Sequence, residues 1–158
     1  MIGIGEKFPA FSLAGINDKN EFVRVDVEEN YTPMKHDWSV VYFYPKDFTP
    51  GCTKEACGFR DNYEVFNNLN CSVFGVSSDS EKRHLSFAKK FNLNFDLIAD
   101  RDKELSNLFQ VQRNLFGLIP GRVTYIFDEN GICQGVFDSL RDADGHIEHA
   151  LNTLKSLD

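Results

Sequence analysis

Two cysteines five residues apart, Cys52 and Cys57, are the side chains in this sequence whose setting most favours chemistry. An apolar run before them ends at Pro45, and Thr49-Pro50 then marks the start of a helix. Threonine can cap free backbone amides, and proline suits the first helical position because it lacks an N–H. Cys52 therefore falls in the first helical turn, where unpaired N–H groups and the positive end of the dipole favour an anion. For cysteine that anion is the thiolate, the nucleophilic form, so the pattern predicts an activated thiol.

An intact helix would hold these two thiols apart. Five residues of α-helix rise roughly 7.5 Å and place the two side chains roughly 140° apart around the axis. The Cα atoms would then be roughly 8 to 9 Å apart, beyond the ~7 Å that a disulfide tolerates. A Cys52–Cys57 bridge therefore requires the first turns to unwind. The alternative is that Cys57 is a small buried hydrophobe on the inner face of the helix, and the spacing alone does not decide between them.

The apolar pattern predicts the elements that position the cysteine helix. Strands are expected over residues 8–13, 21–27, 39–44, 71–77, 95–99, 122–127 and 132–137, and helices over 50–68, 80–91, 102–109 and 144–157. A nearly continuous apolar strand, the cysteine helix and the next strand form a βαβ unit, and a later hairpin with an Asn-Gly turn precedes the last helix. This order is the thioredoxin-like arrangement. It is an α/β fold with a mixed central sheet, helices on both faces and an N-terminal β-hairpin.

Length and composition limit the function further. The 158 residues suit a single domain, 1–158, and the formal net charge of −7 argues against nucleic acid or an anionic membrane surface as the main partner. No apolar run approaches the ~18 residues of a membrane span, and the first residues do not follow a signal-peptide pattern. We therefore expect a cytoplasmic protein, although a removed transit peptide would leave no trace in this sequence. Four cysteines with uneven spacing do not suggest a secreted disulfide scaffold.

The run Pro45-x-x-x-Thr49-x-x-Cys52 resembles the active-site signature of the peroxiredoxins, and the stretch 44–61 resembles the peroxiredoxin Q, or bacterioferritin-comigratory, group. Further matching segments follow in the family's order and cover most of the chain: residues 5–13, 75–79 and 122–128. The resemblance implies a thiol-dependent peroxidase for hydrogen peroxide and small organic hydroperoxides. It also implies no cofactor and no metal, a thioredoxin-like reductant, and a monomer or weak dimer.

The resemblance assigns roles to four residues around the peroxide. Cys52 would be the peroxidatic thiolate, which becomes a sulfenic acid. Arg122 would stabilise the thiolate and the charge on the leaving oxygen. Thr49 would orient the peroxide through its hydroxyl, and Pro45 would shield the pocket from water. The plainer interpretations are a helix cap for Thr49, a strand end for Pro45 and a surface charge for Arg122.

Two further roles follow from the same resemblance. Glu55, one helical turn after the peroxidatic cysteine, would orient the arginine, although a favourable charge near the helix start would also explain it. Cys57 would resolve the sulfenic acid by forming an intramolecular Cys52–Cys57 disulfide. Cys71 and Cys133 are expected to be structural, and either remains an alternative resolving partner.

Two other functions compete with this interpretation. A dithiol–disulfide oxidoreductase is disfavoured because Cys-x-x-x-x-Cys is not the adjacent Cys-x-x-Cys pair. A zinc-binding module could use Cys52, Cys57, His146 and His149, but the gap of two residues between the histidines is short for a zinc finger. All four histidines are expected at the surface: His36, His84, His146 and His149. The apolar segment 114–121 is a candidate for lining the substrate pocket or a partner surface.

Overall fold

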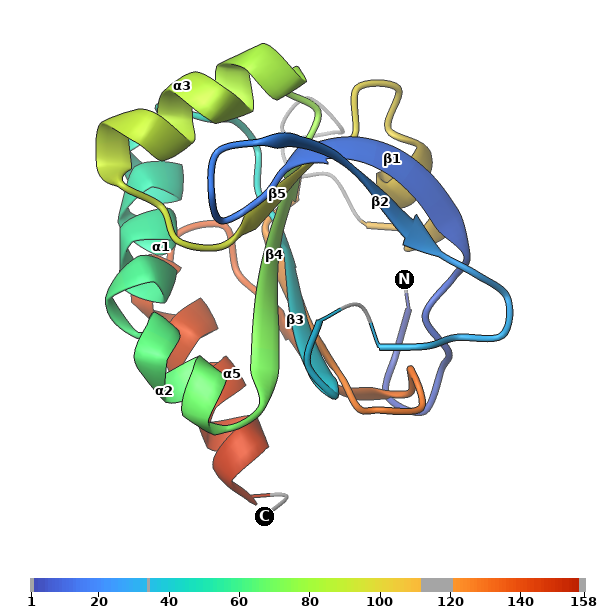
Figure 1. Cartoon of the computed structure of the whole chain (residues 1–158). Helices are drawn as coiled ribbons and strands as arrows, with labels where there is room; N and C mark the ends of the chain where they lie inside the picture. The colour runs from blue at the N-terminus through green and yellow to red at the C-terminus, as the bar shows by residue number, and fades with distance from the viewer. Residues whose placement is uncertain (1, 34, 112–120, 157–158) are drawn as a thin grey trace.

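Seven strands form one mixed sheet in the computed structural model, which describes residues 2–33, 35–111 and 121–156 (Figure 1). The strands are β1 (Phe11–Ile16), β2 (Phe22–Val27), β3 (Trp38–Phe43), β4 (Cys71–Ser77), β5 (Asp96–Ala99), β6 (Val123–Phe127) and β7 (Cys133–Asp138). Their order across the sheet is β2-β1-β5-β4-β3-β6-β7. β3 is parallel to β4 and antiparallel to β6, so the predicted βαβ unit and the mixed sheet are confirmed.

Five helices in the described part of the chain cover this sheet unequally. They are α1 (Pro50–Asp61), α2 (Tyr63–Asn68), α3 (Glu81–Phe91), α4 (Glu104–Leu108) and α5 (Ala143–Ser156). One apolar core joins α1, α2, α3 and α5 to the sheet face that carries Val40 and Tyr42. The core on the opposite face contains Val41 and Phe43 and is closed by α4, the N-terminal segment and the β1–β2 hairpin (Figure 1). The predicted thioredoxin-like fold with helices on both faces is confirmed.

The cysteine helix is shorter than predicted, because the chain interrupts it at Asn62. This residue has φ −102° and ψ 7°, and it ends α1 and precedes α2. Its side-chain amide and its backbone N–H both donate to the carbonyl of Gly58, at 2.8 and 3.2 Å. Asparagine competes well for backbone hydrogen bonds, so it favours such an interruption. The two cysteines therefore lie in a separate helix of 12 residues, α1.

The first strand is also displaced from its prediction. β1 begins at Phe11 rather than Phe8, and it lies between β2 and β5. Phe8 is buried among aromatic rings, and its N–H donates to the carbonyl of Gly131 at 2.8 Å. Its apolar character therefore reflects packing in the core and not strand alternation. Pro9 precedes the strand and removes no hydrogen bond from it.

The start of α4 is capped by a residue from outside the helix. Asp102 does not cap this helix; the carboxylate of Asp100 does so by accepting from the backbone N–H groups of Leu105 and Ser106, both at 2.9 Å. Lys103 lies at the N-cap position with φ 61°. Asp100 directly follows β5 and is nearly fully buried, so its carboxylate reaches the helix start from the end of that strand.

Two sequence expectations receive no further support from the fold. The segment 114–120 of the apolar stretch lies outside the described residues. The single domain 1–158 stays a prediction. Among the described residues, each helix is either too short or too polar to cross a bilayer.

Candidate active site

Cys52 lies in the first turn of α1 and only 1% of its surface is exposed. Thr49 occupies the N-cap position and Pro50 opens the helix, because a residue without an N–H loses nothing there. The strand β3 ends at Phe43, and the loop from Tyr44 to Thr49 carries the chain from the sheet to the helix. The free amides of the first turn and the dipole of α1 therefore favour negative charge near the sulfur.

Thr49 does not cap the helix with its side chain, so that part of the sequence interpretation is wrong. Its backbone has φ −83° and ψ 151°, but its hydroxyl donates to the carbonyl of Lys46 at 2.9 Å. Because the hydroxyl hydrogen is used there, the oxygen is left to accept a hydrogen bond from another donor. Pro45 is half-buried at the start of the same loop, directly after β3.

Arg122 reaches Cys52 from a distant part of the sequence. It directly precedes β6, and the antiparallel pairing of Val123 with Phe43 brings it to the end of β3 from which the helix departs. Its Nη2 donates to the sulfur of Cys52 at 3.2 Å, and its Nε donates to the carbonyl of Leu140 at 2.8 Å. A Cβ at Gly51 would lie 3.1 Å from the same Nη2, so the glycine leaves room for this approach.

Glu55 binds the other side of the guanidinium. Its Oε1 accepts from Arg122 Nη1 at 2.7 Å, and the carboxyl group is fully buried. Burial raises the pKa of Glu55 to about 8, even though Arg122 opposes this shift. Burial by itself lowers the pKa of Arg122, but Glu55 and Cys52 raise it by more, so the guanidinium remains charged.

His146 is a member of this cluster that the sequence interpretation missed. It is fully buried, as is His84, so the expectation of four surface histidines is wrong for these two. Its Nδ1 lies 2.8 Å from Thr124 Oγ1 and 3.5 Å from Glu55 Oε2, and its Nε2 donates to the carbonyl of Ser139 at 2.7 Å. Burial lowers the pKa of His146 to about 4, so the ring is neutral at pH 7. A signal existed, because the residues three before and four after it are buried alanines of α5.

The remaining cysteines have different surroundings. Cys57 is half-buried in α1, and all four cysteines are free thiols. Cys71 and Cys133 are fully buried in the cores on opposite faces of the sheet. Burial raises the pKa of both thiols, that of Cys133 to about 11, and keeps them protonated at neutral pH. The proposed zinc set is not assembled, because among the described residues its four members do not form a group of ligand atoms.

Comparisons with known proteins show the family of this chain. The family model described as AhpC/TSA family matches residues 4–136. The chain belongs to the AhpC/TSA family. A chloroplastic peroxiredoxin Q of Sedum lineare is 47% identical over 118 residues, which are 75% of this chain and 63% of that protein. The chain therefore spans less than two thirds of the length of this relative.

Two solved structures resemble more than nine-tenths of the chain. A cysteine-to-serine mutant of PrxQ from Xylella fastidiosa is 29% identical, with a TM-score of 0.83 over 99% of this chain and 98% of that one. The bacterioferritin comigratory protein of Xanthomonas campestris is 27% identical, with a TM-score of 0.74 over 92% and 91%. The resemblance to the peroxiredoxin Q group is confirmed.

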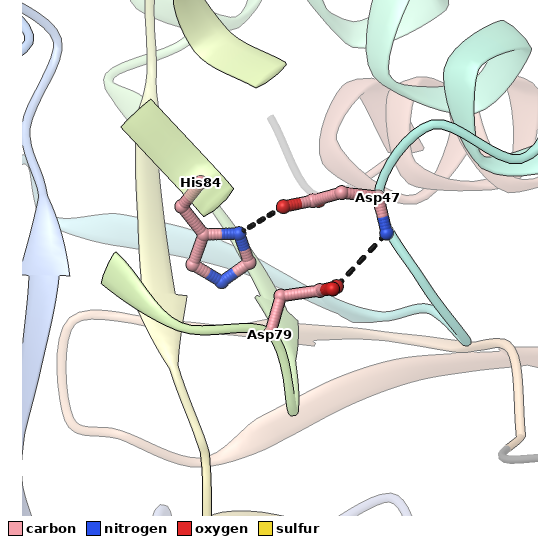
Figure 2. A group of neighbouring side chains, drawn as sticks. All are labelled: Asp47, Asp79 and His84. Carbon is pink, nitrogen blue, oxygen red and sulfur yellow. Dashed lines mark hydrogen bonds and ion pairs between the residues drawn. The ribbon is translucent and has the colours of Figure 1, made fainter. Parts of the chain in front are cut away.

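A second buried cluster of this AhpC/TSA-family chain supports the loop before Cys52. Figure 2 shows Asp47, Asp79 and His84, the one group of side chains in the described residues whose ligand atoms lie close enough to hold a metal ion. Hydrogen bonds already engage these atoms. Asp47 Oδ2 lies 2.6 Å from His84 Nδ1, and Asp79 Oδ2 accepts from the N–H of Asp47 at 2.9 Å and from Ser77 Oγ at 2.6 Å. The geometry is thus that of a closed hydrogen-bond network.

This network anchors the loop to the sheet. His84 Nε2 donates to the carbonyl of Ile98 at 2.9 Å, and Nδ1 faces Asp47, so both ring nitrogens lie against oxygen atoms. The hydroxyl of Tyr44 donates to the second oxygen of Asp47 at 2.6 Å. Arg83 pairs with Asp79 at 3.0 Å and lies over the ring of Phe48, 5.0 Å from its centre. These contacts therefore hold the backbone of the loop and its side chains Tyr44, Asp47 and Phe48 in one arrangement.

Substitution of Asp47 by alanine is expected to lower the free energy of unfolding by about 3–5 kcal/mol, because it leaves His84 as an uncompensated buried group. Urea unfolding at pH 7 measures this change. Asp61→Ala is the control: it removes an exposed carboxylate that pairs with Arg60 at 2.9 Å, and it should cost less than about 1 kcal/mol. Equal effects of the two substitutions would show that the Asp47–His84 pair does not stabilise the fold.

Proposed function

We propose that the chain is a thiol-dependent peroxidase that reduces hydrogen peroxide and small organic hydroperoxides. The observation that carries this proposal is the contact of 3.2 Å between Arg122 Nη2 and the sulfur of Cys52, in the first turn of α1. A charged guanidinium and the helix amides together favour a thiolate at this position. The Xanthomonas campestris relative is described by its alkyl peroxide reduction activity, which supports the same chemistry here.

The first step is an attack of the Cys52 thiolate on the terminal oxygen of the peroxide. The S–O bond forms as the O–O bond breaks, so the sulfur is oxidised by two electrons and the peroxide is reduced to an alcohol, or to water for hydrogen peroxide. The departing oxygen takes up one proton, and Cys52 becomes a sulfenic acid. Arg122 stabilises the charge that develops on the departing oxygen. Thr49 Oγ1 donates its hydrogen to the carbonyl of Lys46, and the same oxygen accepts a hydrogen bond from the O–H of the peroxide.

The second step proposed here is resolution by Cys57. Its sulfur attacks the sulfenic sulfur of Cys52, the hydroxyl leaves as water, and a disulfide forms. Both cysteines lie in the intact helix α1, so the first turns of this helix must unwind before the sulfurs meet. A thioredoxin-like dithiol then reduces the disulfide to two thiols and is itself oxidised.

Mass spectrometry after one equivalent of hydrogen peroxide tests both steps. The reduced protein should consume one peroxide, and proteolysis should yield a Cys52–Cys57 disulfide-linked peptide. Retention of all the peroxide would refute the peroxidase. A disulfide that includes Cys71 or Cys133 would keep the peroxidase but replace the resolving residue.

For Cys57→Ser we expect the first oxidation to survive and thioredoxin-driven cycling to slow by at least about tenfold, because an external thiol lacks the effective concentration of one in the same helix. NADPH oxidation with thioredoxin and its reductase measures the cycling rate. Cys133→Ala is the matched control and should cycle like the wild type, since Cys133 lies in the core on the other face of the sheet. Unchanged cycling in Cys57→Ser would point to another resolving thiol.

The remaining partner and location assignments are part of the same proposal. We infer a monomer or weak dimer from the resemblance to the peroxiredoxin Q group, and the cytoplasmic location stays a prediction. The net charge of −7 supports neither nucleic acid nor an anionic membrane as a partner. Sedimentation of the reduced and oxidised protein measures the oligomeric state.

A further inference from the structure

One guanidinium in this site lies between two groups that can each become an anion. Arg122 donates to Cys52 through Nη2 and to Glu55 through Nη1, and all three residues are less than 5% exposed. If Cys52 and Glu55 were both ionised, this buried cluster would carry a net negative charge. Burial of an uncompensated charge is costly, so one of the two groups is expected to keep a proton.

The arrangement of His146 indicates which group keeps it. The carbonyl of Ser139 only accepts hydrogen bonds, so the facing Nε2 of His146 carries a hydrogen. In the neutral ring Nδ1 is then an acceptor, and Thr124 lies against it at 2.8 Å. Glu55 Oε2 lies 3.5 Å from the same Nδ1, is buried, and has no hydrogen-bond partner among the described residues. A proton on Oε2 that faces Nδ1, an acceptor it shares with the Thr124 hydroxyl, would satisfy this otherwise unpaired oxygen.

We propose that Glu55 and His146 together hold one proton at neutral pH, which leaves the charge of Arg122 to Cys52 and to the departing peroxide oxygen. His146 is a positioning residue, because it acts through Glu55 and Arg122. The inference rests on the peroxidase function proposed above and assigns to it a residue from α5. The pKa shifts of the two groups agree with the geometry: burial raises the pKa of Glu55 to about 8 and lowers that of His146 to about 4.

Three other ionisable groups interact with the pair: Tyr42, Asp142 and His149. Tyr42, from β3, is fully buried, and burial raises its pKa well above 10.0, so it remains neutral. Asp142 and His149 act on His146 with opposite signs, the first raising and the second lowering its pKa. The charge of the cluster therefore depends on the proton of Glu55 and His146.

The consequence is a loss of rate at alkaline pH. The folded pKa of Glu55 is raised, so its proton is present below about pH 8 and is lost above it. The carboxylate formed there neutralises Arg122, which then stabilises the departing oxygen less. Since two charges a few ångströms apart interact strongly in a buried site, the second-order rate constant for Cys52 oxidation should fall on the order of tenfold between about pH 7 and 9.5.

The pH profile of Cys52 oxidation, followed by stopped flow, tests this dependence in three variants of the full chain. Glu55→Gln cannot titrate, so the ratio of its rate constants at the two pH values should be near one. His146→Leu removes the acceptor of the proton and should move the midpoint of the fall to lower pH. Glu148→Gln makes the same charge change on the exposed part of α5 and should keep the wild-type profile. An alkaline fall that persists in Glu55→Gln would overturn the proposal, as would an unmoved midpoint in His146→Leu.

A direct measurement separates this proposal from the peroxidase proposal. In reduced protein labelled with ¹³C-glutamate, the Cδ resonance that disappears in Glu55→Gln belongs to Glu55. Its titration should have a midpoint near 8, not near the usual 4.5. A midpoint near 4.5 in a protein that consumes peroxide would refute the shared proton alone. Absence of peroxide consumption would refute the peroxidase, while the same titration would still report the proton.

Discussion

Replacement of Cys52 by serine is expected to abolish peroxide turnover, with a loss of at least on the order of 10⁴-fold. The substitution changes one atom of a buried side chain, so the fold should survive. A serine hydroxyl is not ionised at neutral pH, and Arg122 cannot compensate for this, so no anionic nucleophile is present. The rate of NADPH oxidation with thioredoxin, thioredoxin reductase and hydrogen peroxide measures the loss.

The control for this substitution is a second buried cysteine. Cys133→Ala alters a thiol in the core on the opposite sheet face and should retain wild-type turnover. Mass spectrometry of Cys52→Ser after peroxide treatment adds an independent result, since Cys57 should then remain a thiol. Turnover within tenfold of the wild type would show that the reactive sulfur lies elsewhere.

Arg122→Met is expected to slow the first oxidation by about 10²–10³-fold, the cost of removing one preorganised donor from a developing oxyanion. Methionine keeps a long, flexible side chain in the buried site but removes the donors to Cys52, Glu55 and Leu140. The second-order rate constant with hydrogen peroxide, measured by stopped flow at pH 7, reports the effect on the chemical step.

Two further variants distinguish the charge of Arg122 from its shape. Arg122→Lys keeps a positive charge but cannot bind Cys52 and Glu55 as a fork, so its rate should lie between those of the wild type and Arg122→Met. Arg101→Met removes an exposed arginine and should leave the rate unchanged. Urea unfolding of each variant shows whether lost stability contributes. A rate for Arg122→Met within threefold of the wild type would exclude the proposed role of the guanidinium.

Local patterns determined much of the fold. β3 is buried on both faces, and apolar residues at nearly every position of its sequence indicate such a strand. β4 begins and ends where the sequence predicts, and α1 begins at the predicted Pro50. These features depend on neighbours within a few residues, which a sequence shows directly. The sequence did not predict the interruption at Asn62 or the capping of α4 by Asp100. Each depends on which of several polar side chains forms the hydrogen bond with a given backbone group.

The six predicted site residues also divide into those that lie close together in the sequence and one, Arg122, that only the fold brings near. Cys52 and Cys57 share α1, and Pro45 and Thr49 lie in or beside the loop before it, all within one short stretch of sequence. The contact of Arg122 with Cys52 spans 70 residues, so only a resemblance could propose it from sequence. The Thr49 side chain illustrates the limit of local reasoning, since its hydroxyl binds backward to Lys46 and not to the helix amides.

The sequence by itself determined the position of Cys52 in the first turn of a helix and the α/β arrangement, because each follows from chain neighbours and periodicity. Only the tertiary structure decided the charge around that sulfur. His146 comes from the last helix and Arg122 from the segment before β6, and both reach the buried carboxyl group of Glu55. The protonation state of a buried carboxyl group depends on the groups that fold against it and on the exclusion of solvent. The neighbouring residues in the sequence show neither of these.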